Sequence, residues 1–182
     1  YALSGEDTHA PAGSIRVGGQ EASRFGPGQR RALGLHFVPE ERLGRGAVPT
    51  LSLAHNLLLS RRDTLGAGGW LRLGALRQQA EDIIQRYNVK ANGPDAAAKS
   101  LSGGNLQKFI VGREIDAKPK VLIVAQPTWG VDVGAAAQIR GELLALRDAG
   151  CAVLVVSEEL EELFELSDRM VVIAGGRLSP SV

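Results

Sequence analysis

The 182-residue chain is long enough to form one domain with a hydrophobic core. Its hydrophobic residues make up 44% and its charged residues 23%, and a net charge of +1 without a basic block argues against a nucleic-acid-binding surface. A single cysteine, Cys151, excludes an internal disulfide, and no apolar run reaches the roughly 20 residues that span a bilayer.

The first third of the chain alternates short elements with loops. Pro39 cannot continue a central ladder, so it ends a strand, and Ser52 is expected to cap a helix that runs through Leu59. The elements predicted in order are a loop over 1–13, a short strand and turn over 14–19, a helix over 27–34 and a strand over 35–38.

The middle of the chain carries two predicted helices. A glycine-rich segment, 61–74, is expected to be a mobile loop. After it, apolar residues recur on one face of a 3.6-residue period. These residues are Leu76, Ala80, Ile83, Ile84 and Tyr87. Residues 92–100 interrupt the pattern, and a second helix is expected to follow "LSGG" and to run to about Asp116.

From Lys120 onward, three apolar runs alternate with two helical segments. The runs are "VLIVA", "CAVLVV" and "MVVIA", and the helices are expected over 134–149 and 158–166. This order predicts an α/β fold with a parallel sheet covered on both faces. The stripes predicted to be buried are Ile139, Leu143 and Leu146 on the first helix, and Leu160, Leu163 and Phe164 on the second.

The segment "LSGGN" is the most specific motif. Ser102 can cap the helix, and Gly103 and Gly104 allow an anion to approach the backbone N–H groups at the helix start. From these residues alone, an ordinary capped helix after a flexible turn is the favoured interpretation. The order of the motifs around the segment decides between the two.

The motifs together resemble the ATP-binding cassette, the motor domain of ABC transporters, over about residues 14–178. The sequences of these motifs most resemble those of the second cassette of bacterial importers of simple sugars and nucleosides. The segments that carry the resemblance are "LSGGN" for the signature, "VPEERLGRG" with "LSLAHNL" for the Q-loop region, "GVDVGA" for the D-loop, "VVSEE" for the H-loop and "LSDRMVVIAGGRL" for the following strand and turn. The resemblance implies a P-loop-NTPase-like fold with a helical subdomain at about 51–112 and a core at about 14–50 and 113–178.

The chain departs from an active cassette at five features that handle phosphate, while "LSGGN" is kept. No GxxxxGK[ST] occurs, and none of the five lysines follows a glycine, so the phosphate loop is expected to precede Tyr1. Ala125 replaces the Walker B acid and Gln126 the catalytic acid. Glu158 replaces the switch histidine and Glu40 the Q-loop glutamine. Losing a general base costs about 10²–10⁴ in rate, so the chain alone is expected to be inactive.

Cassettes of this family work as head-to-tail pairs, with each ATP between the phosphate loop of one and the signature of the other. The resemblance therefore implies that this chain completes its partner's ATP site while its own site is degenerate. The residues expected to face nucleotide are Ser102, Gly103, Gly104, Asn105, Gln107 and Asp132. ATP and Mg²⁺ are expected only in the paired assembly, and no metal-ligating residues are predicted in this chain.

The resemblance also implies partners and a location. The expected partners are a second cassette, fused or separate, transmembrane permease subunits and a periplasmic or lipid-anchored solute-binding protein, at the cytoplasmic face of the membrane. Two alternatives stay open: a soluble ABC ATPase that acts on nucleic acid or ribosomes, and a purely structural dimerisation domain. For Gln126, a polar residue that hydrogen-bonds locally at a strand end is a further interpretation.

The remaining polar residues give weaker signals. His9, His36 and His55 are scattered and are expected at the surface or in loops. The acidic run at 158–165 is expected to form a solvated helix face, and Cys151 to be inert core. Trp129 stands where the family usually has a basic residue, and the sequence offers no physical reason for it.

Overall fold

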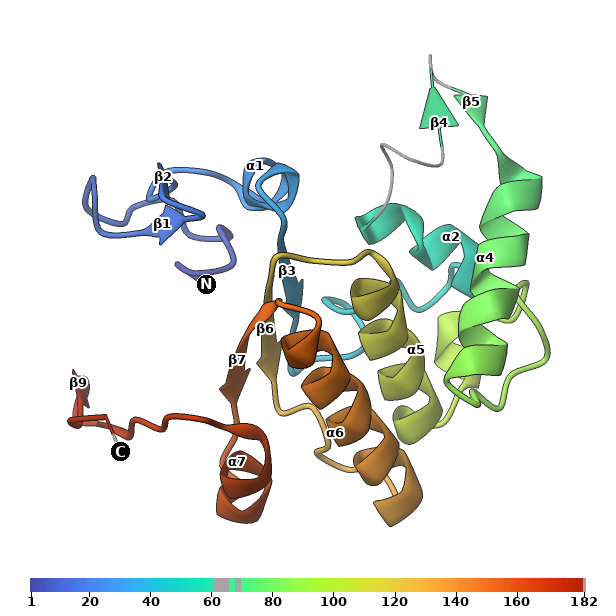
Figure 1. Cartoon of the computed structure of the whole chain (residues 1–182). Helices are drawn as coiled ribbons and strands as arrows, with labels where there is room; N and C mark the ends of the chain where they lie inside the picture. The colour runs from blue at the N-terminus through green and yellow to red at the C-terminus, as the bar shows by residue number, and fades with distance from the viewer. Residues whose placement is uncertain (61–65, 68–69, 182) are drawn as a thin grey trace.

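The computed structural model of the chain describes residues 1–60, 66–67 and 70–181, without the side chains of 66, 67 and 70. In chain order the elements are β1 (Arg16–Val17), β2 (Gln20–Glu21), α1 (Pro27–Ala32), β3 (Leu35–Val38), α2 (Leu53–Asn56), β4 (Gly66–Ala67), β5 (Trp70–Leu71), α4 (Leu73–Arg86), η1 (Ala98–Ser100), α5 (Gly103–Asp116), β6 (Val121–Ala125), α6 (Val133–Asp148), β7 (Ala152–Val156), α7 (Leu160–Leu166), β8 (Ile173–Ala174) and β9 (Arg177–Leu178) (Figure 1). Much of the predicted mobile loop at 61–74 lies outside the described residues.

Three parallel strands in the order β3–β6–β7 form the central sheet. The register aligns Leu35 with Val121 and Val121 with Ala152, so the carboxyl ends of all three strands meet at one edge. A helical crossover separates β6 from β7, as parallel pairing requires. The strand predicted at "LHFV" is confirmed, and so is the parallel pairing predicted for "VLIVA" and "CAVLVV".

Helices α5 and α6 cover one face of the sheet (Figure 1). Val38, Leu122 and Val124 point into this side and are fully buried. They meet Ile139 and Leu143 of α6, which confirms the stripe predicted for that helix, with Leu146 packed partly buried beside it.

The opposite face is covered only in part. Leu35 and Ile123 are buried there beneath Val17 and Ala22 of the N-terminal segment. On β7 the same face is open, because Leu154 is 42% exposed. The expectation that the sheet is covered on both faces is therefore wrong at β7.

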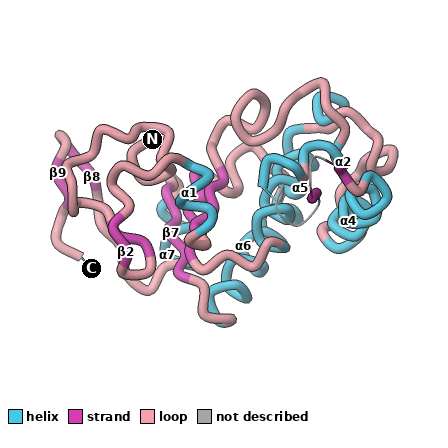
Figure 2. The backbone as a smooth tube through the Cα atoms, turned by 90° about the horizontal axis from the view of Figure 1, so that it is seen from above, coloured by secondary structure: helices cyan, strands magenta, loops and turns pink. Residues whose placement is uncertain are grey.

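The last apolar run does not join the sheet. Only residues 173–174 form a strand, and this strand, β8, pairs antiparallel with β9 across a turn in which Gly175 and Gly176 have φ of +56° and +74°. Among the described residues, β7 is an edge of the sheet, and the run does not pair with it. Its side chains stay exposed, Ile173 by 73%, and Figure 2 shows the hairpin apart from α5 and α6.

Helix α7 is also turned differently from the prediction. Leu160 is 61% and Phe164 70% exposed, whereas Glu162 and Leu166 are buried. Helix α7 contacts α6, and its Glu162 is turned toward the loop after β6, where its Oε1 accepts from Thr128 Oγ1 at 2.6 Å. The predicted buried stripe is wrong for Leu160 and Phe164, and the predicted solvated acidic face is wrong at Glu162.

The helical part packs directly on the core. All five residues of the predicted α4 face are buried, and Tyr87 lies against α5 at Gly112. One continuous hydrophobic cluster includes Leu53 and Leu122, so it spans both expected parts of the cassette. The boundary expected at about 112 falls inside α5, which continues to Asp116. Among the described residues, no helix is long and apolar enough to cross a membrane.

Candidate nucleotide-facing site

The signature turn, residues 101–105, begins α5. Ser102 has extended backbone angles and is the N-cap, and its Oγ accepts from the Asn105 backbone N at 3.5 Å and from Asn105 Nδ2 at 2.9 Å. The N–H groups of Gly103 and Gly104 have no acceptor within the helix, because they belong to its first turn. Ser102 and Gly103 are exposed, so these groups and the positive end of the helix dipole face outward.

The two glycines of the turn have different neighbours. A Cβ at Gly103 would lie 2.8 Å from Nη1 of Arg42, and a Cβ at Gly104 would lie 3.6 Å from Cβ of Val131. Gly103 therefore leaves room for a guanidinium group beside the helix start. Gly104 sits in ordinary contact distance of the loop that follows β6.

Gln107 is placed in the interior, one turn into α5. Its side chain is 1% exposed, its Nε2 donates to the Pro127 carbonyl at 3.0 Å, and its Oε1 accepts from Arg42 Nε at 3.1 Å. Both ends of the amide are therefore used inside the chain. Asn105 lies nearer the surface, and its Oδ1 accepts from the Lys90 backbone N at 2.8 Å.

Four residues predicted at the degenerate site gather at the carboxyl edge of the sheet. We call Glu40, Ala125, Gln126 and Glu158 the strand-end cluster, because they end or follow β3, β6 and β7. Glu40 and Glu158 are exposed. The parallel sheet thus brings together the positions that the sequence assigned to one site.

Gln126 is held by local hydrogen bonds. Its φ is +50°, and its backbone N donates to the Val156 carbonyl at 2.7 Å. Its side-chain Oε1 accepts from Ser157 Oγ at 3.4 Å and from the Glu158 backbone N at 3.5 Å. These contacts match the interpretation of Gln126 as a locally bonded residue at a strand end.

The strand-end cluster does not fit a nucleotide phosphate with Mg²⁺. Magnesium is held by carboxylates and phosphate oxygens, and β6 ends in an alanine and an amide. Among the described residues, no group of three or more His, Cys, Asp or Glu side chains is placed to hold a metal. The acids at 40 and 158 add negative charge where phosphate would lie, so no catalytic step is assigned here.

Asp132 caps α6. Its Oδ1 accepts from the Ala135 backbone N at 2.9 Å, and this hydrogen bond lowers the pKa of its carboxyl, with a smaller contribution from the charge of Lys108. The side chain lies at the surface and is engaged first in capping. Its predicted contact with nucleotide stays a prediction.

Sequence reasoning missed Arg42, and the structure explains Trp129 through it. The guanidinium carbon of Arg42 lies 5.8 Å from the centre of the Trp129 ring, and Arg42 Nη2 also donates to the Trp129 carbonyl. The Trp129 side chain is 59% exposed, so it covers the cation from outside. These residues are 87 positions apart, and no local pattern could have joined them.

A second group missed by the sequence anchors the other end of α5. Glu114 is fully buried and pairs with Arg113 at 2.9 Å, with Arg31 at 2.9 Å and with His36 Nδ1 at 2.8 Å, and Ser60 Oγ also donates to it. Burial alone would raise the pKa of Glu114, but the charge of Arg113, the hydrogen bond with His36 and the charge of Arg31 hold that pKa well below its ordinary value. The expectation that His36 lies at the surface is wrong, because β3 turns it toward this carboxylate. Cys151 is buried, as expected.

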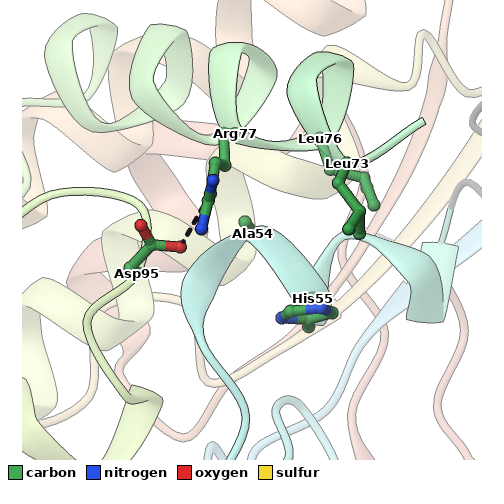
Figure 3. Close-up of a pocket in the computed structure, with 6 residues that line it drawn as sticks. All are labelled: Ala54, His55, Leu73, Leu76, Arg77 and Asp95. Atoms are coloured by element: carbon green, nitrogen blue, oxygen red, sulfur yellow. Dashed lines mark hydrogen bonds and ion pairs between the residues drawn. The ribbon is translucent and has the colours of Figure 1, made fainter. Parts of the chain in front are cut away.

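A small pocket lies away from these residues, between α2 and the start of α4 (Figure 3). Arg77 and Asp95 close one side with an ion pair of 3.0 Å, and His55 lies on α2. No residue of the signature turn or the strand-end cluster lines it. The pocket is not part of the candidate site.

The fold is that of an ATP-binding cassette. A dimeric cassette, MJ0796, in a post-hydrolysis state bound to ADP and Pi superposes with a TM-score of 0.73 at 16% identity, covering 91% of this chain and 71% of that one. A nucleotide-free cassette from an ABC transporter superposes with a TM-score of 0.69 at 19% identity, covering 90% and 66%. These likenesses confirm the predicted α/β cassette fold. No protein-family model matches the chain.

Sequence comparison finds import proteins. The chain is 40% identical to the glucose import ATP-binding protein TsgD13 of Haloferax volcanii over 171 residues, which is 92% of this chain and 31% of that protein. It is 40% identical to the guanosine import ATP-binding protein NupO of Bacillus subtilis, over 94% of this chain and 34% of that protein. The chain thus spans about a third of the length of these curated relatives.

Proposed function

We propose that this chain is the second, degenerate cassette of an importer of simple sugars or nucleosides. Its signature turn completes the ATP site of a partner cassette, and its own strand ends hydrolyse nothing. The observation that carries the proposal is the contrast between an exposed, capped helix start at Ser102 and a strand end at Ala125 and Gln126 that offers no carboxylate.

The signature turn fits a phosphate chemically. Two free backbone N–H groups, a serine hydroxyl and the helix dipole converge at an exposed surface, and the Arg42 guanidinium lies beside Gly103. The strand-end cluster offers two exposed acids and no cation of its own. An ATP molecule with its charge on the phosphates therefore favours the first surface over the second.

The proposal includes the partners and location of such an importer. The partner cassette supplies the phosphate loop and, with Mg²⁺, the hydrolytic groups. Permease subunits and a solute-binding protein complete the assembly at the cytoplasmic face of the membrane, and no nucleic acid takes part. The names of the import relatives support this assignment.

Photo-crosslinking in the assembled importer tests the proposal. The probe is ATP with a photoreactive group on its γ-phosphate, and trypsin then cuts the labelled chain. We expect label in the peptide of residues 100–108, which holds the signature turn, and only when the partner cassette is present. Label on Gln126 itself, located within the peptide of residues 121–140, or label in the isolated chain, would show a working site at Gln126 instead.

Absence of label in both peptides, with the partner cassette labelled normally, would support the structural dimerisation domain. The test variant is Ser102→Arg. Its matched control is Ser14→Arg, which makes the same change in a distant exposed turn. Only the change at Ser102 should remove the label.

A further inference from the structure

Arg42 contacts two segments that are far from it in the sequence, α5 and the loop 126–131. It lies in the loop between β3 and α2, its Nε donates to Gln107 Oε1 at 3.1 Å, and its Nη2 donates to the Trp129 carbonyl. Gln107 in turn donates to the Pro127 carbonyl at 3.0 Å. Arg42 and Gln107 thereby tie the first turns of α5 to the loop 126–131. We call these two residues the clamp.

Glycines on both sides make room for the guanidinium. A Cβ at Gly103 would lie 2.8 Å from Nη1, and a Cβ at Gly130 would lie 3.7 Å from both Nη1 and Nη2. Gly130 also has φ of +63°, which other residues adopt only under strain. The Trp129 ring closes the outer side. The seat is therefore shaped by backbone and ring on separate segments.

The positive charge of Arg42 is not neutralised in the described part of the chain. None of the ion pairs found there includes Arg42, and its acceptors are an amide oxygen and a carbonyl. Arg45, on the same loop, differs: it pairs with Glu6 at 2.6 Å, and its guanidinium carbon lies 4.8 Å from the centre of the Tyr1 ring. Arg45 is thus a matched neighbour with a purely structural set of contacts.

We propose that Arg42 is a positioning residue for nucleotide docking: through Gln107 and Trp129 it fixes the signature turn against the loop 126–131, so that the N–H groups of Gly103 and Gly104 are held where the partner's phosphate arrives. The inference rests on the proposed function. Under this proposal, the loop 126–131 supports the signature turn and takes no part in hydrolysis.

Kinetics of the assembled importer provide the first test. The measurement is solute-stimulated ATPase in vesicles, with KM for ATP and kcat taken separately. Arg42→Ala should lower kcat/KM about 10- to 100-fold, mostly by raising KM, because a charge-assisted hydrogen bond that holds the docking turn is lost. Arg42→Lys should recover part of the loss, since lysine keeps the charge but not the planar fork. Arg45→Ala should stay within about twofold of the parent.

A double-mutant cycle tests the path through Gln107. If the two residues act together, Arg42→Ala combined with Gln107→Ala should cost little more than the worse single change. Arg45→Ala combined with Gln107→Ala should instead be additive. Additive effects in the Arg42 pair would overturn the clamp.

Fluorescence of this chain gives a readout independent of turnover. Trp70→Phe leaves Trp129 as the only tryptophan. In that background, Arg42→Ala should increase acrylamide quenching of Trp129 and Arg45→Ala should not, because only Arg42 lies against that ring. If Arg42→Ala loses its far-UV circular dichroism and so its fold, Arg42→Lys replaces it in both the kinetic and the quenching measurements.

Ser102→Arg, measured in the same ATPase assay, distinguishes a failure of the proposed function from a failure of the positioning role of Arg42. If Ser102→Arg leaves the rate unchanged, the proposed function has failed. If Ser102→Arg removes hydrolysis but Arg42→Ala behaves like Arg45→Ala in KM and quenching, the function stands and the positioning role of Arg42 is wrong.

Discussion

The signature turn and the strand-end cluster differ in what their polar groups are free to do. At the signature turn, Ser102 caps the helix with its side chain and leaves the N–H groups of two glycines facing outward. At the strand end, the side-chain oxygen of Gln126 is already used by Ser157 and Glu158. One region keeps donors available for an anion, whereas the other presents two exposed acids and an amide oxygen that is already hydrogen-bonded.

The two regions share one scaffold, because the parallel sheet aligns the strand ends and α5 starts with a cap. Under the proposed function, they differ in chemistry through the residue types at a few positions. The predictions below test whether the two regions are as unequal as their contacts indicate.

The largest effect is expected at Glu114, which anchors the helix that carries the signature turn. Glu114→Ala should lower the free energy of unfolding by about 3–5 kcal/mol, because it leaves buried Arg113 without its partner. Thermal or urea unfolding measures it. Asp95→Ala removes an exposed ion pair with Arg77 and should cost less than about 1 kcal/mol.

The stability from Glu114 should also depend on pH in one direction. Its native pKa is lowered, so its contribution is present at neutral pH and is lost as pH falls below the ordinary carboxyl pKa of about 4.3. Between pH 7 and pH 3, the parent chain should therefore lose more stability than Glu114→Gln. Equal losses would contradict the buried network.

The next effect concerns charge at the signature turn. Gly103→Asp should lower solute-stimulated hydrolysis of the assembled importer about 10²–10³-fold, because a carboxylate beside Arg42 would occupy the place of the phosphate. Gly28→Asp makes the same change in the first turn of α1, in open space, and should have no effect on hydrolysis. Equal effects at both glycines would contradict the assignment.

A smaller effect is expected where α4 meets α5. Gly112→Ala would bring a Cβ within 2.6 Å of the Tyr87 ring, and it should cost about 1–3 kcal/mol of unfolding free energy. Gly141→Ala lies on α6 with nothing near its Cβ, so it should stabilise by up to about 1 kcal/mol. Denaturant titration of the two variants compares them, and a neutral Gly112→Ala would show that the helices separate easily.

The smallest effect is expected from restoring acids to the strand end. The isolated chain should give no saturable heat on calorimetric titration with Mg-ATP at micromolar protein. Ala125→Asp with Gln126→Glu should leave it unchanged, because the printed sequence contains no GxxxxGK[ST] loop to hold the phosphates. A micromolar dissociation constant, about −8 kcal/mol, would mean that the strand-end cluster binds nucleotide after all.

Periodicity and motif order predicted the parts of the fold that are locally determined. The α4 face, the Ser102 cap and the three parallel strands follow from spacing and from short apolar runs. The run at 170–174 looks the same in sequence, but pairing depends on a neighbouring strand that no local pattern specifies. The prediction of the buried face of α7 was wrong for a similar reason, because Glu162 is buried against Thr128, which is 34 positions away.

The site was predictable where its residues lie in one motif. Ser102, Gly103 and Gly104 are adjacent, and their role follows from helix-start chemistry. Arg42 contacts α5 from 65 positions away, and His36 meets Glu114 from 78 positions away. Such pairs arise only when the sheet and helices bring loops together, so a single sequence carries no sign of them.

The most direct test compares Ser102→Arg with Gln126→Ala in the assembled importer. The measurement is the ATPase rate in reconstituted vesicles with the solute-binding protein present. We expect Ser102→Arg to lower the rate about 10²–10³-fold, because a bulky side chain blocks the docking turn, and Gln126→Ala to stay close to the parent, because no base is lost. A silent Ser102→Arg together with a damaging Gln126→Ala would contradict the account and make the strand-end cluster the working site.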